Sequence, residues 1–164
     1  MLKIKEFYTL KRKFGLYEVS VILFFVIAPI IGAVTEITLL NNSYSLSGVL
    51  LKWFTFSSVG LRLFSAGLKQ SIKPSFTATE IFNADEKSYP IVREVGFSNI
   101  CIGILGILSF FFSDFRLAAA VTGGLYFGLA GFLRLLYKRD RNEIFTTISN
   151  FYIFFVLLVL VLMV

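Results

Sequence analysis

The chain has 164 residues, of which 57% are hydrophobic and only 16% are charged, with a formal net charge of +6 and a mean hydropathy of +0.81. Soluble domains carry about 25% charged residues, so this composition excludes an ordinary soluble protein and indicates a membrane protein. Histidine is absent and Cys101 is the single cysteine. The usual zinc, haem and disulfide-relay sites are therefore excluded, and we expect no cofactor and no metal ion.

Five stretches of the chain are apolar and long enough to cross a bilayer, which takes about 20 residues of helix. They cover residues 16–40, 46–68, 95–112, 117–137 and 144–164. Because they take up most of the sequence, we expect one transmembrane domain over residues 1–164. The predicted fold is an all-α polytopic bundle in which the first four spans form the core and the fifth is peripheral.

The basic residues are distributed unequally between the two sides of this topology. Arg116 is alone on one side, Lys52 and Arg62 lie inside the second span, and the other thirteen are assigned to the opposite side. The thirteen are Lys3, Lys5, Lys11, Arg12, Lys13, Lys69, Lys73, Lys87, Arg93, Arg134, Lys138, Arg139 and Arg141. The positive-inside rule then predicts a multi-pass inner-membrane protein with a cytoplasmic N-terminus and a periplasmic or extracellular C-terminus.

The net positive charge has a second interpretation, which is binding to nucleic acid. Nucleic-acid sites combine basic grooves with exposed aromatic side chains, whereas the aromatic residues here lie within the spans. We therefore expect the bilayer and its anionic headgroups to be the partner, and no nucleic acid.

The first segment of the chain combines a basic lead-in with a long apolar run. Residues 1–15 alternate lysines with apolar residues, as in a short helix on the membrane surface. The apolar run that follows is too long for a signal peptide, so residues 16–40 are predicted to remain as an uncleaved span. Pro29 is expected to kink this span, and residues 41–45 form a tight turn into the second span.

The second span carries a polar stripe. Its members follow one another at intervals of three or four residues, and the last five fall within an arc of about 80° on a helix. They are Lys52, Thr55, Ser58, Arg62, Ser65 and Lys69. Charge at membrane depth is costly, so the stripe is expected to face the bundle interior or a water-filled cavity.

Carboxylates in neighbouring spans are the predicted partners of these cations. By depth, Glu36 matches Lys52 and Glu94 matches Arg62, with Glu18 as a second candidate for Arg62. One interpretation is a set of internal salt bridges that orient the helices. The other is a polar cavity that opens inward, in which Arg62 binds an anion.

The connection over residues 69–90 is long for a small protein. Loops of about 20 residues usually have a function or structure of their own. This one carries Pro74 and Pro90 beside several apolar residues, and it is interpreted either as a lid or as a membrane-surface anchor.

Small residues recur on one face of the third span and on one face of the fourth. The first set is Gly96, Asn99, Gly103 and Gly106, and the second is Ala120, Gly124, Gly128 and Gly131. Such faces let helices approach closely, and an asparagine on them can hydrogen-bond across the contact. The contact could form within one chain or between protomers.

The segment from Arg93 to Ile100, together with the glycine-rich segment from Gly103 to Leu108, resembles the central motif of a small bacterial membrane family. That family is the domain of unknown function 6790, which is similar to the DoxX-like four-helix proteins and typically has Glu-Val-x-Phe-x-Asn before a glycine-rich span. The resemblance covers residues 50–137 and implies a four-helix core. Family members usually carry histidines near the end of span two and in span four; this chain has none, and Gln70 lies near the first place.

Two functions follow from these observations. The first is a non-enzymatic inner-membrane component that binds a small anionic or lipidic ligand, or a partner subunit, which could be a homo-oligomer or another membrane protein. The alternative is a small membrane enzyme that acts on a lipid-like substrate through Glu94 and Arg62. The candidate residues for ligand binding or buried ion pairs are Arg62, Glu94, Glu36, Lys52, Ser58, Ser65 and Asn99. A cavity of about 300 Å³ or more beside Arg62 would favour ligand binding or catalysis.

Overall fold

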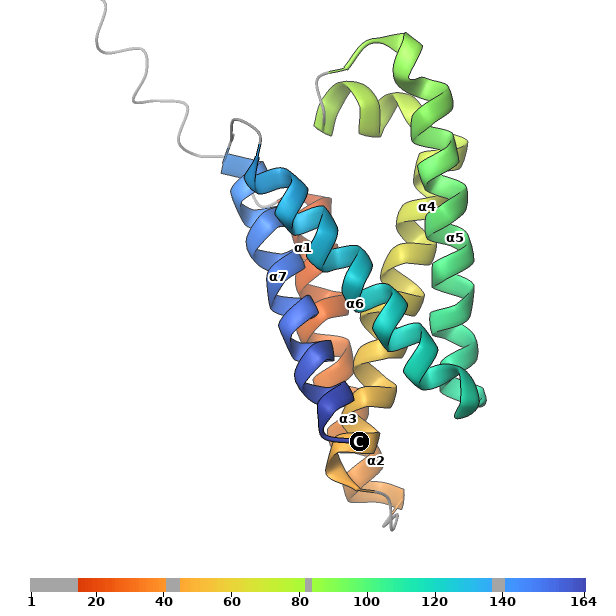
Figure 1. The fold of residues 1–164 in the computed structure, drawn as a ribbon, viewed down its shortest axis with the longest axis vertical. Coiled ribbons are helices and arrows are strands. Elements are labelled where there is room, and N and C mark those ends of the chain that lie inside the picture. Colours follow the sequence, from red (N-terminus) through yellow and green to blue (C-terminus); the bar gives the residue numbers. More distant parts are fainter. Residues whose placement is uncertain (1–14, 41–44, 82–83, 137–140) are drawn as a thin grey trace, which may run out of the picture.

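The computed structural model describes residues 15–40, 45–81, 84–136 and 141–164. The expected surface helix over residues 1–15, the turn at 41–45 and the end of the predicted fourth span fall wholly or partly outside these residues. Every element in the described part of the chain is helical (Figure 1).

The helical elements join into five long rods. The first rod is α1 (Leu16–Ile22), η2 (Leu23–Ile27) and α2 (Ala28–Leu40), and the second is α3 (Leu46–Phe54), η3 (Thr55–Leu61) and α4 (Arg62–Ile72). The short elements η4 (Phe76–Ile81) and η5 (Glu86–Ser88) follow. The last three rods are α5 (Tyr89–Phe111), α6 (Asp114–Leu135) and α7 (Arg141–Leu162).

Four of the rods are long and apolar enough to cross a membrane. They span Tyr17–Leu39, Glu86–Phe111, Asp114–Leu135 and Ile144–Leu162. The second rod, which corresponds to the predicted span over residues 46–68, is not among them. Its polar stripe lowers its hydropathy, so the structure supports four membrane-spanning helices where the sequence predicts five.

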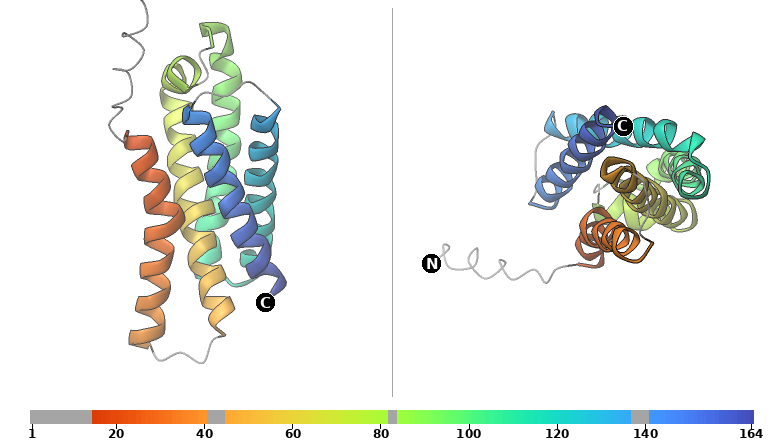
Figure 2. Two further views of the ribbon diagram at one scale, coloured as in Figure 1. Left: turned by 90° about the vertical axis from the view of Figure 1, so that its left-hand side faces the viewer. Right: turned by 90° about the horizontal axis from the view of Figure 1, so that it is seen from below.

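The second rod is the central one. It packs against the first rod, α5, α6 and α7, and the end-on view in Figure 2 shows it among the other four. A helix surrounded in this way presents little surface to lipid, which explains why it tolerates serine, threonine, lysine and arginine.

Wide π-helical turns interrupt the first two rods where they face each other. Segment η2 ends two residues before Pro29, which cannot donate a backbone hydrogen bond, so the expected disturbance takes the form of a widened turn. Segment η3 lies beside it, and Ser57 Oγ donates a hydrogen bond of 2.7 Å to the carbonyl of Phe24. The widened turns thus leave the Phe24 carbonyl able to accept a hydrogen bond from the neighbouring rod.

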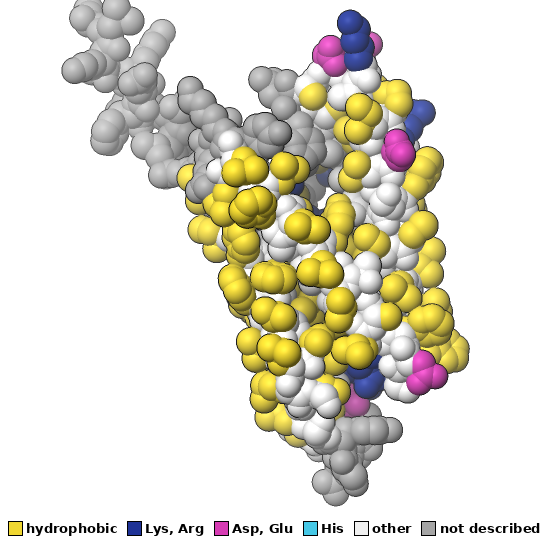
Figure 3. Space-filling model, viewed as in Figure 1, with side chains coloured by type: hydrophobic (Ala, Val, Ile, Leu, Met, Phe, Trp, Pro, Cys, Tyr) yellow, Lys and Arg dark blue, Asp and Glu magenta, His cyan; other side chains and the backbone are white. Residues whose placement is uncertain are grey.

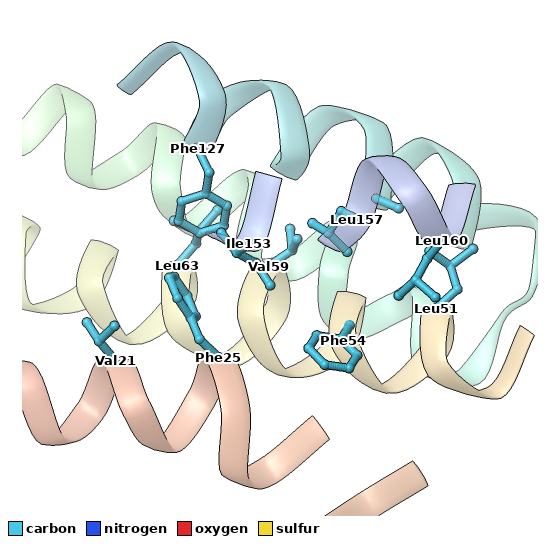
Figure 4. Packing of buried hydrophobic residues seen from close by; sticks show 11 residues of the cluster. Val21, Phe25, Leu51, Phe54, Val59, Leu63, Phe127, Ile153, Leu157 and Leu160 are labelled. Carbon is cyan, nitrogen blue, oxygen red and sulfur yellow. The ribbon is translucent and has the colours of Figure 1, made fainter. Parts of the chain in front are cut away.

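The hydrophobic core lies between the first two rods, α6 and α7 (Figure 4). Ile153 and Leu157 of α7 are fully buried, and Phe25 packs edge-on against Phe127 at a ring distance of 5.2 Å. The fifth span is therefore not peripheral as expected. Its apolar side chains fill the groove left by small residues of α6, where Leu157 lies beside Gly124.

Large apolar side chains also cover much of the outer surface. Figure 3 shows them over the middle of the molecule, with acidic and basic side chains near its two ends. Exposed residues of this kind include Val121, Leu125, Leu129 and Phe132 along α6. An apolar band between two charged ends is the surface that a bilayer requires.

Candidate functional site

A cavity of about 360 Å³ lies between the five rods, towards the end where α1 begins and α4 ends. All five rods and η4 contribute to its walls. Figure 3 shows dark-blue atoms of basic side chains inside a hollow at this end of the molecule. Apolar walls come from the first rod and α6, where Val21, Phe24, Phe25 and Phe127 lie.

Three basic side chains line the cavity, which are Arg62, Lys69 and Arg134. No aspartate or glutamate is among the lining residues in the described part of the chain. The other polar lining groups are neutral hydroxyls and amides, among them Ser20, Ser65 and Thr77. The cavity is therefore an electropositive compartment in an apolar surrounding.

Arg62 is the cation that the sequence places deepest. It begins α4 directly after the buried η3 segment, and its guanidinium carbon lies 5.1 Å from the ring centre of Tyr17. Its Nε atom is buried and has no hydrogen-bond partner. A cation–π contact contributes about 0.5–2 kcal/mol, whereas removing a charge from water costs several kcal/mol. The Tyr17 ring therefore compensates the guanidinium only in part.

Lys69 lies two turns further along the same face of the second rod. Its Nζ atom is 3.3 Å from the ring centre of Phe76, the first residue of η4. Thr77 and Ala78 in η4 are buried, so this part of the 69–90 connection packs against the protein. Ser65, between the two cations, donates its hydroxyl to the carbonyl of Arg62 at 3.0 Å.

An amide pair forms the wall of the cavity next to α5. Asn99 Nδ2 donates to Gln70 Oε1 at 2.7 Å, and both residues line the cavity. Asn99 is only 3% exposed, and its Oδ1 atom has no partner. The asparagine on the small-residue face of the third span thus bonds across to the second rod, within one chain.

The remaining candidate residues lie away from the cavity. Lys52 Nζ is 2.7 Å from Glu36 Oε2, which is the pair expected from depth, and the Trp53 indole donates to the same carboxylate at 2.7 Å. Glu36 is 5% exposed and Lys52 19%. Ser58 is buried and donates its hydroxyl to the carbonyl of Phe54. None of these four lines the cavity.

The expected partners of Arg62 are not brought to it. Glu94 is exposed, and neither Glu94 nor Glu18 lines the cavity. Among the described residues, Glu36 pairs with Lys52, and no carboxylate pairs with Arg62. Gly96 and Asn99 lie on the buried face of α5. At 100° per residue, position 94 points away from that face. Depth in the bilayer does not specify this rotation about the helix axis.

The sequence model of a family of unknown function, DUF6790, matches residues 19–164. This chain belongs to the DUF6790 family. Neither the curated proteins nor the solved structures gave a match. Membership extends over all five rods, and nothing in the comparisons links the family to DoxX-like proteins or to bacteria.

Several lining residues of this DUF6790 protein were not among the sequence candidates. Lys69 is part of the polar stripe, but the positive-inside rule already accounts for it and for Arg134 as topology signals. Thr146 and Asn150 line the cavity from α7 and are buried. Their spacing of four residues in an apolar helix was a usable signal, since it places both polar side chains on one face.

Proposed function

We propose that this DUF6790 protein spans the membrane five times and binds a small anionic ligand or an anionic lipid headgroup in the basic cavity, without catalysing a reaction. The fifth crossing would be the central second rod. Its 27 residues from Leu46 to Ile72 measure about 40 Å at 1.5 Å per residue, and a bilayer core is about 30 Å thick. Its neighbours on all sides supply the surface that meets lipid.

The surroundings of Arg62 support anion binding most directly. A charged group at this depth needs an opposite charge, and the described residues provide none within ion-pair distance. An anion in the cavity would be attracted by both the Arg62 guanidinium and the Lys69 ammonium, because both residues line the same space. Such charge-assisted hydrogen bonds are roughly twice as strong as neutral ones.

The alternative of a membrane enzyme has no comparable support. It required Glu94 to act with Arg62, and Glu94 is exposed on the outer face of α5, away from the cavity. The lining residues in the described part of the chain include no carboxylate, histidine or cysteine to serve as a general base or nucleophile. A role in ligand binding requires only the basic and neutral polar side chains that line the cavity.

The orientation that we propose places the cavity at the cytoplasmic end of the protein. Lys69 and Arg134, which line it, belong to the thirteen basic residues that the positive-inside rule assigns to that side. The ligand would then enter from the cytoplasm or from the inner leaflet.

Thermal unfolding of the purified protein in a neutral detergent tests anion binding. Dioleoyl phosphatidylglycerol should raise Tm, and dioleoyl phosphatidylcholine, which has no net charge, should not. A ligand at about 100 times its Kd adds about 2.7 kcal/mol to the stability of the folded state. Sodium phosphate serves as the soluble anion in the same assay.

Two lysines near the end of the second rod provide a matched pair of variants. Lys69→Gln should reduce the shift caused by phosphatidylglycerol, because Lys69 lines the cavity. Lys73→Gln should leave it unchanged, because Lys73 is exposed, does not line the cavity and carries the same charge. Equal shifts with the anionic and zwitterionic lipids, or equal losses in the two variants, would contradict the proposal.

A further inference from the structure

Two unpaired polar atoms of opposite kind belong to residues that line the cavity. Arg62 Nε is a buried donor without an acceptor, and Asn99 Oδ1 is a buried acceptor without a donor. Buried polar groups in folded proteins are nearly always paired, so each unpaired group requires an explanation. An anion bound at Arg62 would supply the acceptor for Nε, but Asn99 Oδ1 would still have no donor.

The amide of Asn99 is held in place. Its Nδ2 atom is engaged with Gln70 Oε1, and this bond leaves Oδ1 as the free end of the side chain. The small-residue face of α5 fixes the backbone as well, since a Cβ atom on Gly96 would lie 2.6 Å from Ser71 Oγ and 2.9 Å from Ser71 N. The acceptor is therefore a fixed and unpaired group among the residues that form the wall.

The charge of the cavity restricts the kind of donor that can reach Asn99. Arg62 and Lys69 line the same space, and no carboxylate in the described part of the chain lines it. An ammonium group on the ligand would be repelled by these cations. A hydroxyl donates a hydrogen bond without adding positive charge, so it is the donor that fits.

The volume restricts the ligand further. About 360 Å³ lies at the lower end of the range for small-molecule pockets, which is about 300–1,000 Å³. The cavity is too small for both chains of a diacyl lipid, but it has room for a headgroup or for a small polar molecule.

We propose that the ligand is a polyol phosphate, whose phosphate oxygen accepts from Arg62 and whose neighbouring hydroxyl donates to Asn99 Oδ1. This inference rests on the proposed anion-binding function and names the ligand class. The polyol phosphate could be the headgroup of an inner-leaflet lipid, such as phosphatidylglycerol, or a free molecule, such as glycerol phosphate. Both present an anionic oxygen and a hydroxyl a few bonds apart.

Two anionic lipids, of which only one has a polyol headgroup, provide the test. Dioleoyl phosphatidylglycerol and dioleoyl phosphatidylmethanol each carry one phosphodiester charge and the same chains, but only the first has hydroxyl donors. Binding to the full-length protein is measured by titration under native mass spectrometry. We expect phosphatidylglycerol to bind about tenfold more tightly, which corresponds to one hydrogen bond to a buried amide.

The preference should depend on the Asn99 amide. The double variant Asn99→Leu with Gln70→Leu removes both members of the amide pair, so neither is left unpaired in the fold. In this variant phosphatidylglycerol should lose its advantage, while phosphatidylmethanol should bind as it does to the wild type. Ser98→Ala is the control, since Ser98 is the exposed neighbour of Asn99 on α5 and does not line the cavity. The preference should survive that change.

The possible results distinguish the proposed ligand class from the proposed anion-binding function. Equal binding of the two lipids to the wild type would overturn the hydroxyl assignment and leave anion binding intact. Binding of neither lipid, nor of glycerol 3-phosphate or methyl phosphate, would overturn the proposed function itself. A preference of glycerol 3-phosphate over methyl phosphate would support a free ligand, and a preference seen with the lipids alone would support a headgroup.

Discussion

Arg62 and Lys52 are two cations of the same rod that differ in how they are neutralised. Lys52 is bound by Glu36 within the protein, and its Nζ atom also lies 4.8 Å from the ring centre of Phe110. Arg62 has the ring of Tyr17 and no carboxylate among the described residues. Lys52 is therefore neutralised within the protein, whereas Arg62 can bind a ligand. Opposite effects of mutation follow from this difference.

Arg62→Met should leave the stability of the ligand-free protein unchanged or raise it slightly. Removing a buried charge that has no internal partner strands no other charge, and methionine fits the apolar surroundings. The measurement is the free energy of unfolding in detergent without added lipid. A loss of about 3–5 kcal/mol that is recovered by adding Glu94→Leu would show that Arg62 has an internal carboxylate after all.

Glu36→Leu should destabilise the protein by about 3–5 kcal/mol, because it leaves the Lys52 ammonium and the Trp53 indole without their shared acceptor. Adding Lys52→Met should recover most of the loss, and further adding Trp53→Phe should recover the rest. Unfolding free energies of the series give the result, with Glu94→Gln on the exposed face of α5 as the control. A single variant as stable as the wild type would mean that the pair contributes nothing.

At the scale of elements, the two faces of small residues have different uses. On α5 they meet the backbone of the second rod, and a Cβ atom on Gly67 would lie 2.6 Å from the carbonyl oxygen of Gly96. On α6 they receive side chains of α7, and a Cβ atom on Gly124 would lie 3.6 Å from Leu157 Cβ. Backbone cannot move aside as a side chain can, so the α4–α5 contact requires its glycines more strictly.

Gly67→Ala should therefore destabilise the protein by about 1–3 kcal/mol, whereas Gly124→Ala should have an effect within about 0.5 kcal/mol. Both changes add one methyl group to a buried glycine of a long helix. Tm of the two purified variants gives the comparison directly. Equal losses of stability would show that the distance between the helices, rather than contact with backbone atoms, determines the cost of the added methyl group at both glycines.

Residue patterns predicted some of these elements and not others. The period of the polar stripe indicated an inward-facing second rod, and depth in the bilayer identified Glu36 as the partner of Lys52. Neither pattern specifies rotation about a helix axis, so Glu94 was wrongly matched to Arg62. The burial of α7 was missed because its apolar residues lie on every face, and apolarity alone does not distinguish a lipid-facing side from a core-facing one.

For the whole molecule, five rods arranged with one in the centre imply an odd number of crossings if each rod spans the bilayer. The two ends of the chain would then lie on opposite sides. A reporter that is active only outside the cytoplasm should work when fused after Val164, and a reporter that is active only in the cytoplasm should work when inserted after Lys73. A cytoplasmic signal at Val164 would contradict five crossings and would favour four.

An anion bound in the basic cavity should remain with the protein when a mild detergent extracts it from the membrane. Native mass spectrometry of protein extracted in a mild detergent, with no lipid added, tests anion binding at Arg62 most directly. We expect the wild type and Arg93→Gln, whose exposed cation lies outside the cavity, to retain one anionic molecule per chain. Arg62→Gln should be recovered without it. Equal retention by Arg62→Gln and the wild type, or retention of neutral lipid alone, would contradict the claim that Arg62 binds an anion.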